Sequence, residues 1–223
     1  MAHRRNIAPA LLAEGTALTR AAAGIGMRFA VEPEKNANIE DTIFAASVEG
    51  MERDDLRMLA VLVTWLDVHS AWINADRLIR LVASAESPRV RAFWAAIAAW
   101  KNTDHRFRRL SKLHRGAPVP LLRAGSKFQL ARSGEDPRFA GAALEVPAQV
   151  LRARATDVLS TAELARQHSA YRWRVIIGPT YRADMWAELE RRPALSAAEL
   201  ARHCYGSFST AWHVRRDRAA LAS

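Results

Sequence analysis

Three successive segments between residues 55 and 100 have the apolar spacing of amphipathic α-helices. Their hydrophobic residues recur three and four positions apart over 55–70, 73–85 and 88–100. The last segment opens with Ser87-Pro88, a favourable start because proline at the first helical position lacks only an N–H that would be unpaired anyway. This spacing predicts a mostly α-helical fold.

The composition limits the class of protein. Half of the 223 residues are apolar, which is typical of a globular chain with room for one large domain or two small ones. The net charge of +10 favours a polyanionic partner. Because Cys204 is the single cysteine, no internal disulfide can form, and a reducing cytoplasm is expected.

No segment has the pattern of a secretory signal or a membrane span. The apolar run 7–13 contains Pro9 and ends at Glu14, and the densest apolar run, 58–66, is too short to cross a bilayer. We therefore expect a cytoplasmic protein that does not associate with membranes.

Most of the excess positive charge lies in the segment 104–132, where Asp104 is the only acid. Its cations are Arg106, Arg108, Arg109, Lys112, Arg115, Arg123, Lys127 and Arg132. Two β-prone runs, 119–123 and 127–130, flank Ala124-Gly125-Ser126, which predicts a β-hairpin. Three helices followed by a basic hairpin is the plan of a winged helix, with the hairpin along DNA phosphates. The alternative is a solvated basic face on an ordinary domain.

The segment 32–55 is acidic and follows a helix expected over 9–23. Its carboxylates are Glu32, Glu34, Glu40, Asp41, Glu49, Glu52, Asp54 and Asp55. We interpret them as a solvated helix face, with the acids near the helix start favoured by the dipole. Whether this segment folds back onto the basic face is left open.

An eight-residue motif occurs twice, 36 residues apart. Leu159-Ser160-Thr161-Ala162-Glu163-Leu164-Ala165-Arg166 matches the segment beginning at Leu195 at seven of eight positions. After the first copy no glycine turn appears, so residues 167–177 are predicted to continue one connector helix with Leu164, His168, Tyr171 and Val175 on its inner face. We treat the repeat as coincidental.

The second copy opens a tail that is expected to form two short helices. Ser196 and Glu199 have the spacing of a capping box, and Gly206 is expected to supply the positive φ that ends the first helix. Ser207 or Ser209 caps the second helix, which would carry Ala211, Val214 and Leu221 inward. A preceding helix over 180–192 would complete a three-helix unit.

The tail resembles the helix-turn-helix of bacterial transcription regulators, although Gly206 falls about one residue later than in the commonest form of the motif. It is also weakly similar to helix-turn-helix antitoxins of the abortive-infection type, which are partners of nucleotidyltransferase-like toxins. The expected organisation is an N-terminal helical and acidic segment (1–53), a helical domain with the basic hairpin (54–150), a connector helix (151–179) and the C-terminal helix-turn-helix (180–223).

If the tail binds DNA, the exposed side of its last helix carries the base contacts, and the hairpin grips phosphates. The candidate DNA-binding residues of the tail are Arg202, Ser207, Ser209, Thr210, His213 and Arg216, beside the basic residues Arg106, Arg108, Arg109, Arg123, Lys127 and Arg132. The alternative for each is an ordinary solvent-exposed residue. We expect Trp212 and Cys204 to be packing residues.

The sequence gives no indication of catalysis. His203, Cys204 and His213 lack a fourth ligand, so we expect no metal site, and no nucleotide, hydrolase or protease motif is present. No cofactor is expected, and the chain is not expected to be an enzyme. The leading hypothesis is a regulator that reads double-stranded DNA, as a homodimer on a palindromic site. The alternative is an antitoxin that neutralises a co-encoded toxin.

Overall fold

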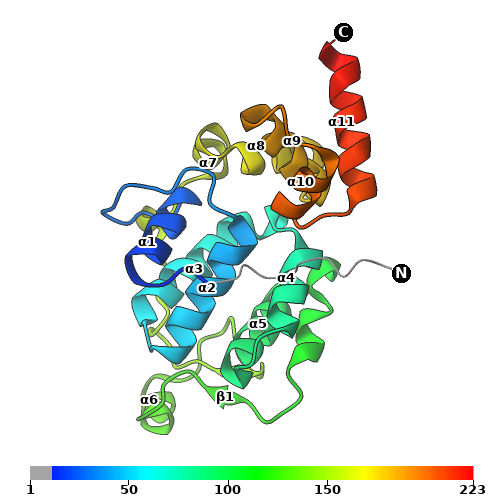
Figure 1. Ribbon diagram of the computed structural model, residues 1–223. Coiled ribbons are helices and arrows are strands. Elements are labelled where there is room, and N and C mark those ends of the chain that lie inside the picture. The colour runs from blue at the N-terminus through cyan, green and yellow to red at the C-terminus, as the bar shows by residue number, and fades with distance from the viewer. Residues whose placement is uncertain (1–11, 223) are drawn as a thin grey trace.

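The computed structural model describes residues 12–222, and almost all of its regular structure is helical (Figure 1). The N-terminal part contains α1 (Gly15–Gly24), α2 (Ile39–Glu52), α3 (Leu56–His69), η1 (Ser70–Trp72), α4 (Ala75–Ala83) and α5 (Pro88–Trp100). The middle contains η2 (His105–Phe107), η3 (Leu110–Leu113), β1 (Val119–Pro120), α6 (Ser126–Ser133) and β2 (Leu144–Glu145). The C-terminal part contains η4 (Ala155–Asp157), α7 (Thr161–Gln167), α8 (Ser169–Ile177), α9 (Tyr181–Arg191), α10 (Ala197–His203) and α11 (Phe208–Ala222).

The mostly α-helical fold and the three helices predicted from apolar spacing are confirmed as α3, α4 and α5. Each begins with a capping side chain that accepts a hydrogen bond from a backbone N–H of the first turn: Asp55, Asn74 and Ser87 respectively. The helix expected over 9–23 corresponds to α1, and its predicted start at Pro9 lies outside the described residues.

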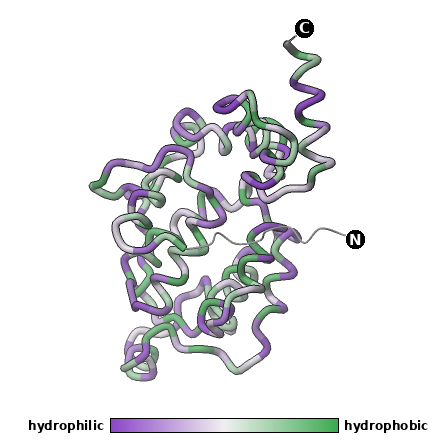
Figure 2. The backbone as a smooth tube through the Cα atoms, in the orientation of Figure 1, coloured by the Kyte–Doolittle hydropathy of each residue, from purple (hydrophilic) through white to green (hydrophobic). Residues whose placement is uncertain are grey.

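A large hydrophobic core lies between α2, α3, α4 and α5, which form the centre of the molecule (Figures 1 and 2). Trp65 and Trp94 are fully buried in it, and each satisfies its indole N–H: Trp65 donates to the Ile25 carbonyl at 2.7 Å, and Trp94 donates to Ser47 Oγ at 2.9 Å. The same core includes Leu18 of α1 and Tyr171 of α8. Segments far apart in the sequence therefore share one core.

The predicted basic hairpin is wrong. Val119 and Pro120 pair in parallel with Leu144 and Glu145, and residues 126–133 form helix α6 instead of a returning strand. Phe128 on this helix is 68% exposed, so the second run packs no apolar face against the first. Without the hairpin, residues 54–132 do not have the wing of a winged helix.

The predicted connector helix is broken in two. At His168 the backbone becomes extended (φ −121°, ψ 108°), which ends α7 and starts α8. His168 Nδ1 accepts the Tyr171 N–H at 3.1 Å and so caps α8. Leu164, His168 and Tyr171 are buried as predicted, whereas Val175 is exposed and Arg174 takes the inner position.

No helix of residues 12–222 combines the length and the apolar character needed to cross a bilayer.

Candidate nucleic-acid interface

The last three helices form a unit with its own small core. Met185, Trp186 and Leu189 of α9 pack against Leu200 and Ala201 of α10 and against Ala211 and Val214 of α11. The predicted capping box of α10 is present: Ser196 Oγ accepts the Glu199 N–H at 3.2 Å, and Glu199 accepts the Ser196 N–H at 2.8 Å. The buried Cys204 belongs to the same core, as expected.

The turn between α10 and α11 differs from the prediction. Tyr205, rather than Gly206, has the positive φ (55°) that follows α10. Glycine at 206 serves another purpose, because a Cβ there would lie 2.3 Å from Met185 Cε on α9. Gly206 thus permits the turn to lie directly against α9.

A left-handed tyrosine is unfavourable, so surrounding contacts must hold it there. The Tyr205 hydroxyl donates a 3.0 Å hydrogen bond to Asp41 on α2, and its ring lies 3.3 Å from the guanidinium carbon of Arg77 on α4. The turn is therefore fixed by the main body of the protein and not only by its own unit.

Helix α11 projects from the molecule and leaves most of its surface exposed (Figure 1). Ser209, His213 and Arg216 are exposed and follow one another at helical spacing, so they share one stripe. Thr210 does not join them: it is half-buried, with its hydroxyl 2.7 Å from that of Ser207, which caps α11 by accepting the Thr210 N–H at 3.1 Å.

A second, apolar stripe lies on the same helix. Phe208 is 60% exposed and Trp212 is 49% exposed, so the expectation that Trp212 is a packing residue is wrong. Leu221, predicted to face inward, is 79% exposed. The tube of α11 in Figure 2 changes between purple and green along its length, consistent with these mixed stripes.

Four exposed cations lie between the end of η2 and the residues just after η3, and they form what we call the basic strip: Arg108, Arg109, Lys112 and Arg115. Within residues 12–222, no carboxylate forms an ion pair with any of these four side chains. Arg106 is different because it pairs with Asp104 at 2.5 Å. The basic strip is therefore a concentration of uncompensated positive charge.

The other predicted phosphate contacts lie elsewhere. Arg123 pairs with Glu52 at 3.3 Å and with Asp54 at 3.1 Å, so the acidic segment does fold back onto part of the basic segment. Lys127 and Arg132 are on α6, at the opposite end of the molecule from α11 (Figure 1). The structure does not bring these three residues together with the tail.

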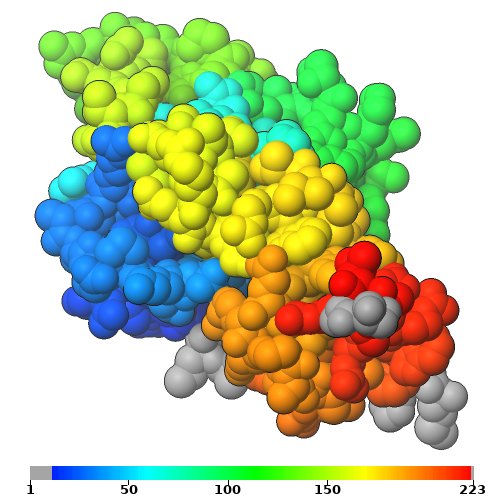
Figure 3. Space-filling model, turned by 90° about the horizontal axis from the view of Figure 1, so that it is seen from above, coloured from blue at the N-terminus to red at the C-terminus, as the bar shows by residue number. Residues whose placement is uncertain are grey.

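The basic strip is connected to the tail by a cleft. Arg106 and Arg109 line one wall of a cleft of about 370 Å³, and Thr180 and Tyr181 at the start of α9 line the other. Tyr181 in turn lies against Gly206, its Cβ 3.3 Å from the position a Cβ would take there. Seen from above, the green residues around the strip and the red residues of α11 lie toward the same edge of the molecule, with the amber residues around the end of α8 between them (Figure 3).

A buried group of charges, which we call the charged junction, fixes the tail unit to the body. Arg174 of α8 donates to Glu40 at 2.6 and 2.8 Å and to Asp184 of α9 at 2.7 and 2.9 Å. Arg77 pairs with Asp41, whose other oxygen accepts from Tyr205. Arg174 and Glu40 are at most 1% exposed, so their charges are compensated by each other rather than by water.

Burial shifts the ionisation of these groups in different directions. Burial raises the pKa of Asp41 and of Asp184 above the ordinary value of an aspartate, despite the guanidinium beside each. Burial opposes ionisation of Glu40 too, but the charge and hydrogen bonds of Arg174 hold its pKa below the ordinary value. Burial also lowers the pKa of His168 to about 4, so this histidine is neutral near pH 7.

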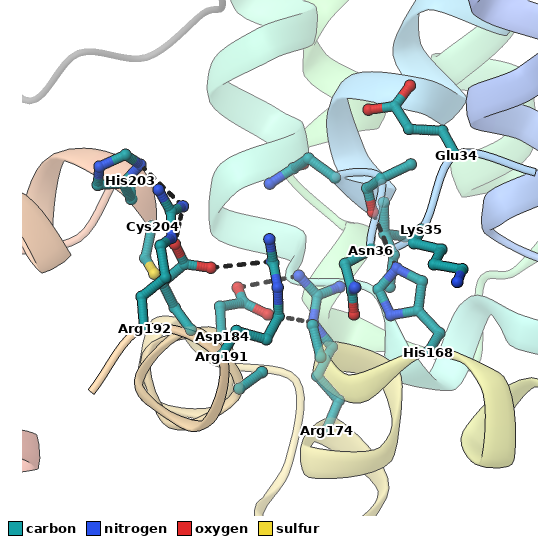
Figure 4. Close-up of a pocket in the computed structure, with 16 residues that line it drawn as sticks. Glu34, Lys35, Asn36, His168, Arg174, Asp184, Arg191, Arg192, His203 and Cys204 are labelled. Carbon is teal, nitrogen blue, oxygen red and sulfur yellow. Dashed lines mark hydrogen bonds and ion pairs between the residues drawn. The ribbon is translucent and has the colours of Figure 1, made fainter. Parts of the chain in front are cut away.

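A cavity of about 250 Å³ lies beside the junction, between the loop before α2 and helices α8, α9 and α10 (Figure 4). In Figure 4, Arg174 and Asp184 point toward one another, and Arg192 approaches His203, with Nη2 3.4 Å from Nδ1. Glu188 binds both Arg191 and Arg192, which partly neutralises that wall. Among residues 12–222 no group of three or more His, Cys, Asp or Glu side chains is arranged to hold a metal ion.

The residues that the sequence analysis missed are those of the charged junction. Glu40 and Asp41 were interpreted as part of a solvated face, which is wrong because both face partners from distant helices. Two features of the sequence could have indicated the junction. One is an arginine among the apolar positions of α8, and the other is the pair of acids in the first turn after the capping residue Asn38. Comparison of the chain with protein-family models, curated proteins and solved structures finds no match.

Proposed function

We propose that this protein binds duplex DNA, with α11 in the major groove and the basic strip on the phosphate backbone. The observation that carries the proposal is the position of the strip, on the same side of the molecule as α11 and joined to it through the start of α9. Uncompensated cations supply sequence-independent affinity by releasing counterions from DNA. Ser209, His213 and Arg216 supply donors and acceptors of the kind that contact base edges.

The charged junction gives this arrangement its rigidity. Because Tyr205 is bound by Asp41 and Arg77, the orientation of α11 relative to the strip is fixed before DNA arrives. Little conformational entropy is then lost on binding. Two copies related by a two-fold axis would present two α11 helices to a palindromic site.

The test compares two triple variants that remove equal charge. Arg108→Ala/Lys112→Ala/Arg115→Ala removes most of the strip, whereas Arg20→Ala/Lys127→Ala/Arg132→Ala removes three exposed cations from α1 and α6. In fluorescence anisotropy with a mixed-sequence duplex, the strip variant should lose affinity by at least about a hundredfold at low salt. The control variant should lose much less affinity for the duplex. Equal losses would mean that net charge, and not this surface, determines binding.

A second function is favoured by one observation, the exposed aromatic stripe of α11. Phe208 and Trp212 are large apolar side chains in solvent, and such side chains on a projecting helix are typical of protein interfaces. This supports an antitoxin-like role in which α11 binds a toxin encoded beside this gene. Phe208→Ser/Trp212→Ser should abolish co-purification with the product of a neighbouring reading frame and weaken duplex binding much less than the loss of the basic strip does. Co-purification that persists, together with a loss of duplex affinity, would mean that the aromatic stripe binds DNA.

A further inference from the structure

The cleft between the basic strip and α9 combines several features of an anion site. One wall presents the side chains of Arg106 and Arg109, and the other is the first turn of α9. Its volume of about 370 Å³ is within the range of ligand pockets, about 300–1,000 Å³. The cleft is also open to solvent, since Arg109 and Thr180 are both exposed.

Helix α9 begins without a side-chain cap. Thr180 is at the capping position with an extended backbone (φ −128°, ψ 161°), but its hydroxyl accepts no hydrogen bond from the helix. The positive end of the dipole of this 11-residue helix is therefore directed at the cleft without a side-chain acceptor from Thr180, and the acid of the first turn, Asp184, is paired with Arg174. By contrast, Ser160 and Ser196 complete capping boxes on α7 and α10.

Asn74 supplies independent evidence that the cleft is built for an acceptor. It lines the cleft and is 3% exposed, and its Oδ1 caps α4 by accepting the Arg77 N–H at 3.3 Å. Within the described residues 12–222, its Nδ2 has no hydrogen-bond partner. Buried donors are rarely left unpaired because their desolvation is not recovered, so an amide in this state points to an absent acceptor.

The one carboxylate in the cleft does not oppose an anion strongly. Asp76 accepts hydrogen bonds from Arg80 at 3.0 and 3.3 Å and from the Tyr181 hydroxyl at 3.0 Å. Its oxygens are thus occupied and its charge is paired. Arg109 is the opposite case, because no carboxylate of residues 12–222 forms an ion pair with it. The balance of charge in the cleft therefore favours a negatively charged ligand.

We propose that this cleft binds one phosphate group, held by the Arg109 guanidinium, the first turn of α9 and the Asn74 amide. Helix N-termini and arginine side chains both bind phosphate well, and here they face each other across one cleft. The phosphate belongs either to the DNA backbone or to a small free ligand. The first source rests on the proposed function, and it would anchor the duplex between the strip and α11.

Two variants test the cleft without removing its framework. Arg109→Ala deletes the guanidinium, and Arg20→Ala is the control for loss of one exposed charge. Thr180→Asp places a carboxylate at the capping position, where it should cap α9 and repel phosphate. We expect Thr180→Asp to unfold at or above the wild-type temperature and yet to bind duplex at least about tenfold more weakly. Arg109→Ala should reduce the slope of log K against log salt by about 0.9, and Arg20→Ala should not.

The same variants distinguish the two sources of phosphate when amide spectra of ¹⁵N-labelled protein are recorded with duplex and with inorganic phosphate. Shifts of the amides at 180–182 with duplex, lost in Arg109→Ala, support the DNA phosphate. Shifts with inorganic phosphate alone, in a protein that does not bind duplex, support the cleft and contradict the proposed function. Duplex binding that is unchanged in both variants, together with shifts from inorganic phosphate that are lost in Arg109→Ala, supports the cleft with a free ligand as the source. No shift with either probe, or shifts that persist in Arg109→Ala, overturns the cleft proposal.

Discussion

The hydroxyl of Tyr205 donates a 3.0 Å hydrogen bond to Asp41, across 164 residues of sequence. One residue is in the turn before α11, and the other is in the first turn of α2. Because Arg77 pairs with the same aspartate and lies over the tyrosine ring, the three side chains form one contact between the tail unit and the body. The direction in which α11 projects therefore depends on residues far from it in the chain.

Tyr205→Phe tests this contact. The ring and its interaction with Arg77 remain, but the largely buried carboxylate of Asp41 loses a donor, so the free energy of unfolding should fall by about 1–2 kcal/mol. The pKa of Asp41, already raised by burial, should rise further. Urea unfolding and titration of the Asp41 carboxyl by NMR measure the two effects. A variant as stable as the wild type would show that the hydrogen bond contributes nothing to joining the two parts.

Arg174→Met should be among the most destabilising substitutions in the chain. It leaves Glu40, which is fully buried, without its guanidinium partner, and removal of one member of a buried ion pair costs about 3–5 kcal/mol. Arg172→Met is the matched control, because Arg172 pairs with Glu190 on the surface, where such pairs contribute about 1 kcal/mol or less. Similar losses in urea unfolding would contradict the role given to the junction.

Two buried histidines should make the protein sensitive to mild acid. Burial lowers the pKa of His69 and of His168 to about 4, from 6.5 when exposed. A histidine with a lowered pKa contributes stability above pH 6.5 and loses it as the pH falls toward 4, at most about 3 kcal/mol each. The raised pKa values of Asp41 and Asp184 act in the opposite direction, since their contribution is lost as the pH rises.

Urea unfolding of the wild type and of His168→Gln between neutral pH and pH 4 isolates the histidine effect, because both proteins share the aspartates. The variant should be less stable at neutral pH, since it loses the cap of α8 and the 2.9 Å contact with the Ala37 carbonyl. It should, however, lose less stability on acidification. Parallel pH profiles would mean that His168 is not buried in its neutral form.

Local sequence patterns predicted the helices well because their causes are local. Apolar spacing and the capping residues Asp55 and Ser87 determine α3 and α5 within a few residues. The capping box at Ser196 was predicted for the same reason, and the first copy of the repeated motif forms one of nearly identical geometry at Ser160.

Contacts between distant segments were not predictable in the same way. The strand at Val119 pairs with Leu144 and not with its sequence neighbours, and no nearby residue indicates that partner. Glu40 and Asp41 resemble surface acids until Arg174 and Arg77 are placed beside them by the packing of α8 and α4. Their burial depends on the tertiary structure, which overrides the usual preference of charged residues for solvent.

Within the candidate site, the burial of residues on α11 also depends on tertiary contacts, which helical spacing alone does not reveal. Helical spacing correctly placed Ala211 and Val214 inward, but it also placed Leu221 inward, where the helix extends beyond the end of α9 and has nothing to pack against. The four residues of the basic strip were recognised as cations, yet only the structure distinguishes them from Arg106 and Arg123, whose charges are paired.

The most direct test of the central claim is the salt dependence of duplex binding by the wild-type protein. Anisotropy titrations from about 50 mM to 200 mM salt should give a slope of log K against log salt of about −3.6 or steeper, the value for four phosphates neutralised by the basic strip. Replacing Arg108, Arg109, Lys112 and Arg115 by alanine should remove most of that slope. A wild-type protein that does not bind duplex at the lowest salt, or a slope that is the same after the replacement, would contradict the account.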